Sequence, residues 1–595
     1  MVEGIIEKEP LVEKLNTEKE VALNFQKRRH SHWNDNYTLY RDFVETNRLI
    51  QRQAVNVPLM KETIKTLLSK IDEVPDIVFE AKEEEMSERE MIDKVIRGEW
   101  GGEDEKLKEI AINERWQYDF WRLKMELIDI VDKKNVLLYG RSFKKLNYLD
   151  KEFDCDVLDI YDVLIDPKTS PLNIETARYI IHQNINKPLN EILTSDKYEE
   201  EGKEKLKIFL TSEEGLVASG EAKERLEEKA ERLKTLGSED YQELEELLSG
   251  SEVIVPLDEH YTNLWDEKKK KFVRYLIILA FGNIVLLRQP LKEIIGVEFY
   301  PFVSWADDLE GSDIWSDSVG DILRTPNKVI NAWISQLIEN RTLRNYGMFA
   351  YDATADKTFI PQTFEPKPFG LYPFPGDPNK VLKQIEIPDL KDSIQEMTFL
   401  IQLMEKASAA TAIEKGVSEK KQITLGEVEI LVGKAMERIS NISKFYRLGW
   451  KEFAEKWYEI LEANESEAKT IKLSKVSAKG NLFGRTIKPS DWKSKAGYRV
   501  KVLSSAEQEA ERTSTIQKLM AVKQMFPENS ALQKIAQRKI LDLLKLSPEE
   551  INQVLEEEKK RIIAPPVSSE GGRLKGPIKE TAEKVASSLP AGVPA

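Results

Sequence analysis

The sequence predicts an α+β protein that is predominantly helical. Apolar residues recur at helical spacing over most of the chain, and a few short runs of β-branched and aromatic residues between turn residues predict strands. The chain has 595 residues, a length that corresponds to roughly four domain-sized units. Such a chain can bury a large hydrophobic core without help from disulfides or metals.

Composition and charge argue against several classes of protein. The formal net charge of -15 argues against a protein whose whole surface coats nucleic acid. The only cysteine, Cys155, excludes a disulfide within the chain, and we expect it to be a small buried hydrophobe. No H-E-x-x-H or C-x-x-C pattern occurs, so we expect neither a metal site nor a cofactor. The longest apolar run, residues 276–287, is shorter than the about 20 residues of a membrane span, so we expect a soluble chain with no membrane partner.

The first part of the chain predicts helices followed by short strands. Residues 1 to about 135 have helical apolar spacing, and a helix with one apolar stripe is expected over residues 116–131. Turn residues then separate β-branched runs, which predict short strands at residues 136–140 and 155–165. Residues 197–249 are rich in Glu and Lys, and they predict a helical insertion exposed on the surface.

The middle of the chain predicts a hairpin and then a well-marked helix. Residues 272–287 fit two strands joined by a tight turn at Gly282-Asn283. In the helix that follows, Thr325 is the expected N-cap and Pro326 lies in the first turn, where a missing N–H costs nothing. One apolar stripe runs along this helix and consists of Val329, Ile330, Trp333, Ile334, Leu337 and Ile338.

Two further helices flank a proline-rich segment. Residues 347–388 are rich in proline and aromatic side chains, and they predict a compact irregular module with short edge strands. A helix is expected at residues 390–412, followed by a polar loop at 417–422. Thr424 and Glu427 form the capping box of a long helix that runs to about residue 464. Its expected buried side carries Trp450, Phe453, Trp457 and Leu461.

The last part of the chain begins with its most basic stretch, residues 469–501. This stretch ends in a predicted strand, in which Tyr498, Val500 and Val502 alternate with polar residues. Residues 505–563 predict helices, and the tail from residue 564 is rich in Pro, Gly and Ser and is expected to be flexible.

The strongest enzymatic hypothesis rests on carboxylates. Asp307 and Asp308 begin an acidic cluster that could hold two magnesium ions for phosphodiester cleavage, and its other members are Glu310, Asp313, Asp317 and Asp321. The simpler interpretation is that aspartates before and within the first turn of a helix stabilise its N-terminus. Residues 426–434 lack both the spacing and the hydroxyl of a phosphate-binding loop. We therefore favour a protein that is not an enzyme and keep the metal-dependent nuclease as the alternative.

The order of these pieces resembles the portal proteins of tailed bacteriophages, particularly the podovirus type. The resemblance covers about residues 40–560 and depends on the sequence and spacing of several short stretches. They are residues 47–71 with Asn56-Val57-Pro58, 121–140, 159–167 ending in Asp166-Pro167, 177–182, Pro301-Phe302, 327–338 with Asn331, and 498–502.

The resemblance implies a portal fold with wing, stem, clip and crown, which assembles as a ring of twelve subunits at one vertex of the capsid. The wing would be residues 1–316 with the insertion 197–249, and the return through the wing would be residues 424–504. Between them, the implied parts are the first stem helix (317–345), the clip (346–388), the second stem helix (389–412) and the tunnel loop (413–423). The crown would be residues 505–563, and 564–595 the flexible tail.

The resemblance also implies partners. Double-stranded viral DNA would pass through the ring during packaging and ejection. The clip would bind the large subunit of the terminase motor and later a head-completion or tail adaptor protein, while the major capsid and scaffolding proteins would surround the ring. The protein would form in the host cytoplasm during assembly and remain in the virion. Another ring-forming head–tail connector or collar protein is the second alternative.

Two groups of basic residues are candidate contacts. Lys415, Lys420 and Lys421 of the tunnel loop could approach phosphates in the channel, or they could belong to an ordinary solvated connection. A basic patch in the return through the wing could contact DNA, or it could balance acidic residues across a subunit boundary. Its candidate residues are Lys472, Lys475, Lys479, Arg485 and Lys488.

Overall fold

Two antiparallel sheets form the centre of the fold. The structure is a computed structural model, and it describes residues 10–42, 55–71, 74–82, 102–149, 151–212, 253–267, 270–311, 313–346, 348–351, 382–385, 393–408, 425–467, 469–476, 482–494, 497–503, 517 and 520. The larger sheet has the strand order β4-β5-β6-β7-β8, and the smaller has the order β3-β2-β9. The strands of the larger sheet are β4 (Val163–Ile165), β5 (Tyr179–Pro188), β6 (Ile254–Asp266), β7 (Lys271–Ala280) and β8 (Ile284–Pro290). Those of the smaller are β2 (Arg141–Leu149), β3 (Glu152–Val157) and β9 (Phe302–Ala306).

Three further sheets have two strands each. The first pairs β1 (Asp76–Ala81) with β14 (Tyr498–Leu503), and the second pairs β10 (Met348–Tyr351) with β11 (Leu382–Ile385); both pairs are antiparallel. The third pairs β12 (Lys469–Val476) with β13 (Leu482–Ile487). Contacts divide the chain into one unit of residues 1–471 and 485–509 and another of residues 472–484 and 510–595. Residues 472–476 of β12 and 482–484 of β13 belong to the second unit.

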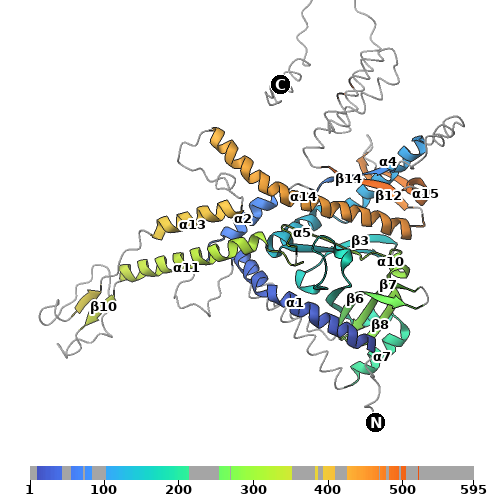
Figure 1. The fold of residues 1–595 in the computed structure, drawn as a ribbon, viewed down its shortest axis with the longest axis horizontal. Coiled ribbons are helices and arrows are strands. Elements are labelled where there is room, and N and C mark those ends of the chain that lie inside the picture. The colour runs from blue at the N-terminus through green and yellow to red at the C-terminus, as the bar shows by residue number, and fades with distance from the viewer. Residues whose placement is uncertain are drawn as a thin grey trace, which may run out of the picture. The chain divides into compact units, whose positions relative to one another are not determined.

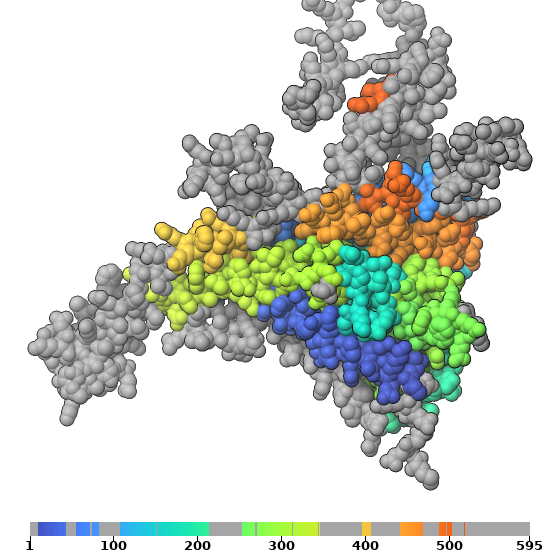
Figure 2. Space-filling model, viewed as in Figure 1, coloured from blue at the N-terminus to red at the C-terminus, as the bar shows by residue number. Residues whose placement is uncertain are grey.

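Helices surround the sheets (Figure 1). Of these, α14 lies against β9, β2 and β14, while α11 contacts α1, α2, α5 and α13. The surfaces of α1 and α11 lie side by side in Figure 2. The helices are α1 (Pro10–Arg41), α2 (Leu59–Leu68), α4 (Gly102–Arg122), α5 (Met125–Tyr139), α6 (Leu189–Thr194), α7 (Glu200–Leu210), α10 (Leu291–Ile295), α11 (Val319–Tyr346), α13 (Ser393–Ser408), α14 (Leu425–Asn464) and α15 (Pro489–Trp492), with single 3₁₀ turns at Ile160–Asp162 and Ile174–Thr176. No helix within the described ranges has the length and apolar character needed to cross a membrane.

Two predictions about local structure are confirmed. The side of α14 that carries Trp450, Phe453, Trp457 and Leu461 is buried, as its helical spacing predicts. The predicted tight turn between β7 and β8 is present, but its central residues are Phe281 and Gly282, both with positive φ, one residue earlier than the expected Gly282-Asn283. In this turn the N–H of Asn283 donates to the carbonyl of Ala280, an arrangement that matches the right-handed twist of the flanking strands.

The predicted strand at residues 136–140 is wrong, because this segment is the last turn of α5 and its C-cap. Four consecutive apolar or aromatic residues fit either a short strand or a buried helix end by periodicity alone. The predicted helix over residues 116–131 is likewise two helices, separated at Leu123-Lys124, where Lys124 has φ 50°. Its expected apolar stripe is only partly buried, since Trp121, Leu127 and Val131 are exposed.

Two more expectations need correction. Part of the segment expected to be an exposed insertion packs on the larger sheet, because α7 contacts β8 and buries Leu206 and Phe209. Helix α11 begins at Val319, so Thr325 is not its N-cap and Pro326 lies inside the helix. The capping residue Thr424, the tunnel-loop segment and the predicted crown and tail, apart from the single residues 517 and 520, lie outside the described residues.

Candidate functional site at the start of helix α11

The first turn of α11 is closed by a reciprocal pair of hydrogen bonds. The backbone N–H of Asp321 donates to Ser318 Oγ at 3.0 Å, and the backbone N–H of Ser318 donates to Asp321 Oδ2 at 3.0 Å. This is a capping box, in which two N–H groups without partners in the helix are satisfied at once. The negative charge of Asp321 also lies at the positive end of the helix dipole. The N-cap of α11 is therefore Ser318, seven residues before the expected Thr325.

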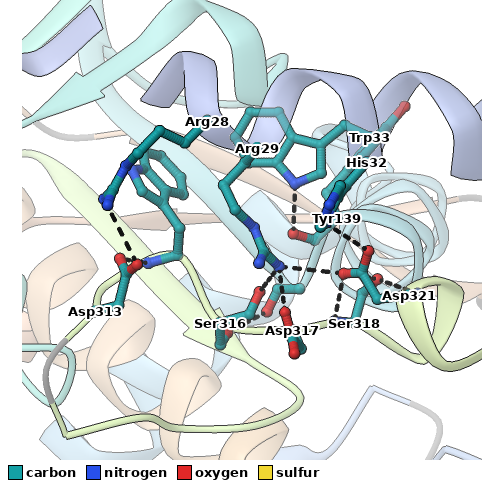
Figure 3. Close-up of polar contacts among 12 residues, drawn as sticks. Arg28, Arg29, His32, Trp33, Tyr139, Asp313, Ser316, Asp317, Ser318 and Asp321 are labelled. Carbon is teal, nitrogen blue, oxygen red and sulfur yellow. Dashed lines mark hydrogen bonds and ion pairs between the residues drawn. The ribbon is translucent and has the colours of Figure 1, made fainter. Parts of the chain in front are cut away.

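Arginine side chains of α1 bind the carboxylates that precede and begin α11 (Figure 3). Arg29 Nη2 lies 2.7 Å from Asp317 Oδ1 and 3.2 Å from Asp321 Oδ2, and it also donates to the carbonyl of Ser316. Arg28 Nη2 lies 3.8 Å from Asp313 Oδ2. Three members of the acidic cluster are thus paired with guanidinium groups of one helix.

Asp307 has a different environment from the rest of the cluster. Its Oδ2 accepts a hydrogen bond of 3.0 Å from the backbone N–H of Val319, the first residue of α11. Burial raises the pKa of the Asp307 carboxyl well above its ordinary value, with a smaller contribution from neighbouring Asp308. A carboxyl that is readily protonated and buried in this way is a poor ligand for Mg²⁺, which prefers ionised oxygen ligands and keeps several waters.

The carboxyl end of α5 completes this junction. Its carbonyl groups have no partners within the helix, and Asn36 Nδ2 donates to Leu138 O while Trp33 Nε1 donates to Tyr139 O. Gly140 ends the helix with φ 87°. A Cβ at Gly140 would lie 2.3 Å from the carbonyl oxygen of Ser316, so only glycine fits at this crossing. We call the contacts of Arg28–Asn36, 138–140, Asp307 and 313–321 the α11 junction.

An extended segment holds the next part of α11. The backbone N–H of Val57 donates to Asn331 Oδ1 at 2.9 Å, and that of Val55 donates to Ser335 Oγ at 3.1 Å. Asn331 Nδ2 also donates to Asn56 Oδ1. Two stretches that are far apart in the sequence, Asn56-Val57-Pro58 and the helix around Asn331, are therefore in direct contact.

The side chains at the junction mainly hold the start of α11 in place. Asp313, Asp317 and Asp321 face arginines, while Asp307 accepts a backbone N–H. Within the described ranges, no group of three or more His, Cys, Asp or Glu side chains could hold a metal ion. The geometry favours the interpretation that these carboxylates stabilise the start of a helix.

The predicted basic residues fall into three groups. Lys415, Lys420, Lys421 and Lys479 lie outside the described residues. Lys472 and Lys475 lie in β12 and Arg485 lies in β13, so three of the candidates belong to one pair of strands. Lys488 is exposed, and its backbone N–H donates to Asp491 at the start of α15.

Sequence reasoning missed the residues that organise the junction. Ser318 could have been found, because Ser-x-x-Asp immediately before an apolar helix is close to the capping-box pattern. Arg29 could not, because its partner Asp321 is 292 residues away in the chain. Nothing in the spacing of charges over such a distance identifies a pair.

At the junction, carboxylates before and within the first turn of a long helix are paired with arginines of α1. The chain belongs to the phage SU10 portal protein family, whose family model matches residues 41–556. This match confirms the resemblance to phage portal proteins, and the mixture of helices and sheets is consistent with it. No curated protein matches the chain significantly.

Proposed function

We propose that the chain forms a ring of twelve subunits at one capsid vertex, through which viral DNA is packaged and later ejected. The observation that carries the proposal is the arrangement of α11, β10, β11 and α13. Helices α11 and α13 contact each other, and the antiparallel pair β10–β11 lies in the segment of chain between them. A pair of helices that leads to a small strand module suits a stem and a clip.

The α11 junction supports a mechanical role for this helix pair. A stem helix connects the wing to the clip and has to hold them in a fixed relation. Its base therefore requires firm attachment. In the described chain, the base of α11 is bound by α1 and by the end of α5, and its middle is bound by the segment 55–57. We assign residues 317–345 and 389–412 to the two stem helices, 346–388 to the clip, 1–316 and 424–504 to the wing, and 505–563 to the crown.

Charge supports a conduit rather than a tight DNA-binding protein. Twelve chains of -15 each give the ring a large negative charge, which would not grip a polyanion. Lys415, Lys420 and Lys421 in the tunnel loop would supply weak contacts to phosphates. The logarithm of the binding constant should then fall only shallowly with the logarithm of salt concentration, since each neutralised phosphate contributes about −0.9 to the slope.

The partners in this proposal act at different parts of the ring. The clip binds the terminase large subunit and afterwards a head-completion or tail adaptor protein, while capsid and scaffolding proteins surround the wing. The chain has no catalytic step of its own. Incubation with DNA and Mg²⁺ or Mn²⁺ should therefore leave the DNA intact, whereas cleavage that is lost in Asp307→Ala/Asp308→Ala would establish the nuclease instead.

The mass of the purified assembly tests the proposal directly. Twelve chains of 68.6 kDa weigh about 823 kDa, and negative-stain images of the same fraction should show rings with a central hole. The measurement is repeated with scaffold and capsid proteins present, because assembly of a ring can require partners. A chain that forms no ring under either condition would contradict the proposal.

A further inference from the structure

In the middle of helix α5 charged side chains are buried and apolar ones are exposed, while the two ends of the helix bury apolar side chains such as Met125 and Leu137. The side that faces the protein carries Asp129, Asp132 and Lys133, which are only 2%, 0% and 5% exposed. The opposite side carries Leu127, Ile130 and Val131, which are 60%, 54% and 48% exposed and follow the i, i+3, i+4 spacing of one helical face. A surface helix of a monomeric protein normally has the opposite arrangement.

The buried charges fix this orientation. Asp129 pairs with Lys133 at 2.7 Å and accepts a hydrogen bond of 2.7 Å from the hydroxyl of Tyr446 in α14. Asp132 pairs with Lys144 of β2 at 2.7 Å and accepts from Trp305 Nε1 of β9 at 2.7 Å. Rotating α5 to bury its apolar face would break these pairs and leave the charged groups exposed or unpaired. An unpaired charge is costly when it stays buried. The outward position of the apolar face is therefore a fixed property of the folded subunit.

A large aromatic side chain adds to the exposed surface. Trp121 in the last turn of α4, just before the break that leads into α5, is 61% exposed. We call Trp121, Leu127, Ile130 and Val131 the α5 outer face. These four side chains are 48–61% exposed, and exposed apolar side chains that gather on one face mark interaction sites.

We propose that the α5 outer face is covered by a second copy of this chain, as one side of the contact between neighbouring subunits. The inference rests on the proposed ring. A closed ring uses head-to-tail contacts, in which each subunit presents two different surfaces to its two neighbours. The apolar character suits such a permanent contact between identical chains, whose interfaces are more apolar than transient ones.

The charges beside the outer face agree with a protein partner. Exposed Lys124 and exposed Glu126 carry opposite signs next to the apolar side chains, as in the polar rim of a protein interface. A DNA contact would instead require several basic residues aimed at phosphates.

Cysteine labelling tests the inference in the full chain. The only native cysteine, Cys155, is buried, and burial raises the pKa of its thiol, so a cysteine introduced at Ile130→Cys would be the one that reacts with a maleimide. We expect labelling of Ile130→Cys to be at least about tenfold slower in purified rings than in dissociated subunits. Ile208→Cys in α7, at a side chain that is 56% exposed and far from α5 in the sequence, is the matched control and should label equally in both.

A charge on the same face tests its contribution to assembly. Ile130→Asp should fold with an unchanged thermal midpoint because the site is exposed, but it should raise the protein concentration needed for half-assembly by at least about tenfold. Ile208→Asp should assemble like the wild type.

The outcomes separate the inference from the proposed function. Rings that form normally with Ile130→Asp, or that label at Ile130→Cys as fast as free subunits, would overturn the inference and leave the ring intact. Protection that occurs only in complete capsids would assign the face to the capsid protein and would also overturn it. Slow labelling in dissociated subunits would mean that the chain covers its own face. A wild-type chain that forms no ring, even with scaffold and capsid proteins, would overturn both proposals.

Discussion

The side chain of Asn331 accepts a hydrogen bond from the backbone N–H of Val57, with 2.9 Å between Oδ1 and the nitrogen. The same side chain donates to Asn56 through its Nδ2. A single amide thus satisfies one donor and one acceptor of an extended segment that has no strand partner within the described residues. This contact joins α11 to a segment 274 residues earlier in the chain.

Replacing Asn331 tests how much this contact contributes. Asn331→Ala leaves the Val57 N–H without its partner, so we expect the free energy of unfolding to fall by about 1–3 kcal/mol. Chemical unfolding of the dissociated subunit measures the change. Asn331→Asp keeps an acceptor for Val57 and should lose less, and equal losses in the two variants would show that the acceptor is unimportant.

The capping box predicts which hydroxyl starts α11. Ser318→Ala should lower the free energy of unfolding by about 1 kcal/mol because the N–H of Asp321 loses its acceptor. Thr325→Ala is the matched control, since Thr325 is exposed inside the helix and should change stability by less than about 0.5 kcal/mol. Thermal unfolding of both variants checks this, and a larger effect at Thr325 would contradict the observed start of the helix.

Gly140 should tolerate no side chain. Gly140→Ala would place a Cβ 2.3 Å from the carbonyl oxygen of Ser316 at a residue with φ +87°. We expect a loss of more than about 3 kcal/mol, or failure to fold, because the backbone strain and the clash act together. Gly311→Ala, where nothing lies within 4 Å of the new Cβ, should unfold at the midpoint of the wild type. Similar behaviour of the two variants would argue against the close crossing of α5 and the segment before α11.

We predict that the buried His260 makes the folded protein less stable in mild acid. It is buried in β6, and burial lowers the pKa of its imidazole to about 4 despite the nearby carboxylate of Asp258. At pH values above the ordinary pKa of about 6.5, His260 is neutral in both the folded and the unfolded chain, so it contributes no pH dependence there. As the pH falls from about 6.5 to about 4, the unfolded chain gains a proton and the folded chain does not. The folded state should therefore lose on the order of 3 kcal/mol over this range.

A comparison of pH profiles isolates this contribution from that of the carboxylates. His260→Leu cannot titrate, and neither ring nitrogen of His260 has a hydrogen-bond partner to lose. Between pH 7.5 and pH 4 the difference in unfolding free energy should thus shift in favour of His260→Leu by on the order of 3 kcal/mol, because only the wild type is weakened by this group. Parallel profiles would show that the histidine is hydrated or paired in solution.

The accuracy of the sequence predictions depended on how local the decisive interactions are. The aromatic side of α14 and the turn at Gly282 follow from helical spacing and from turn chemistry, which involve neighbouring residues. The end of α5 could not be predicted, because an apolar run such as residues 136–139 fits a strand equally well. The start of α11 was misplaced because Pro326 normally marks a first turn, although the pattern of Ser318 and Asp321 was present.

The candidate site was harder to predict from the sequence than the fold. The aspartates of residues 307–321 could be recognised as a cluster, and the interpretation as a helix start was available from their position. Their partners could not be recognised, since Arg28 and Arg29 belong to α1, far from these aspartates in the sequence. The outward position of Leu127, Ile130 and Val131 in α5 could not be predicted either, because a sequence does not state which face of a helix is turned inward.

The contact between Arg29 and Asp321 has a consequence for how the subunit is made. The ribosome adds 292 residues between these two partners, and at roughly 5–20 residues per second this takes about 15–60 s. During that interval α1 has left the ribosome, but its arginines do not yet have their carboxylate partners at the junction. The carboxylate partners of α1 at the junction therefore become available only after the chain as far as Asp321 has been synthesised.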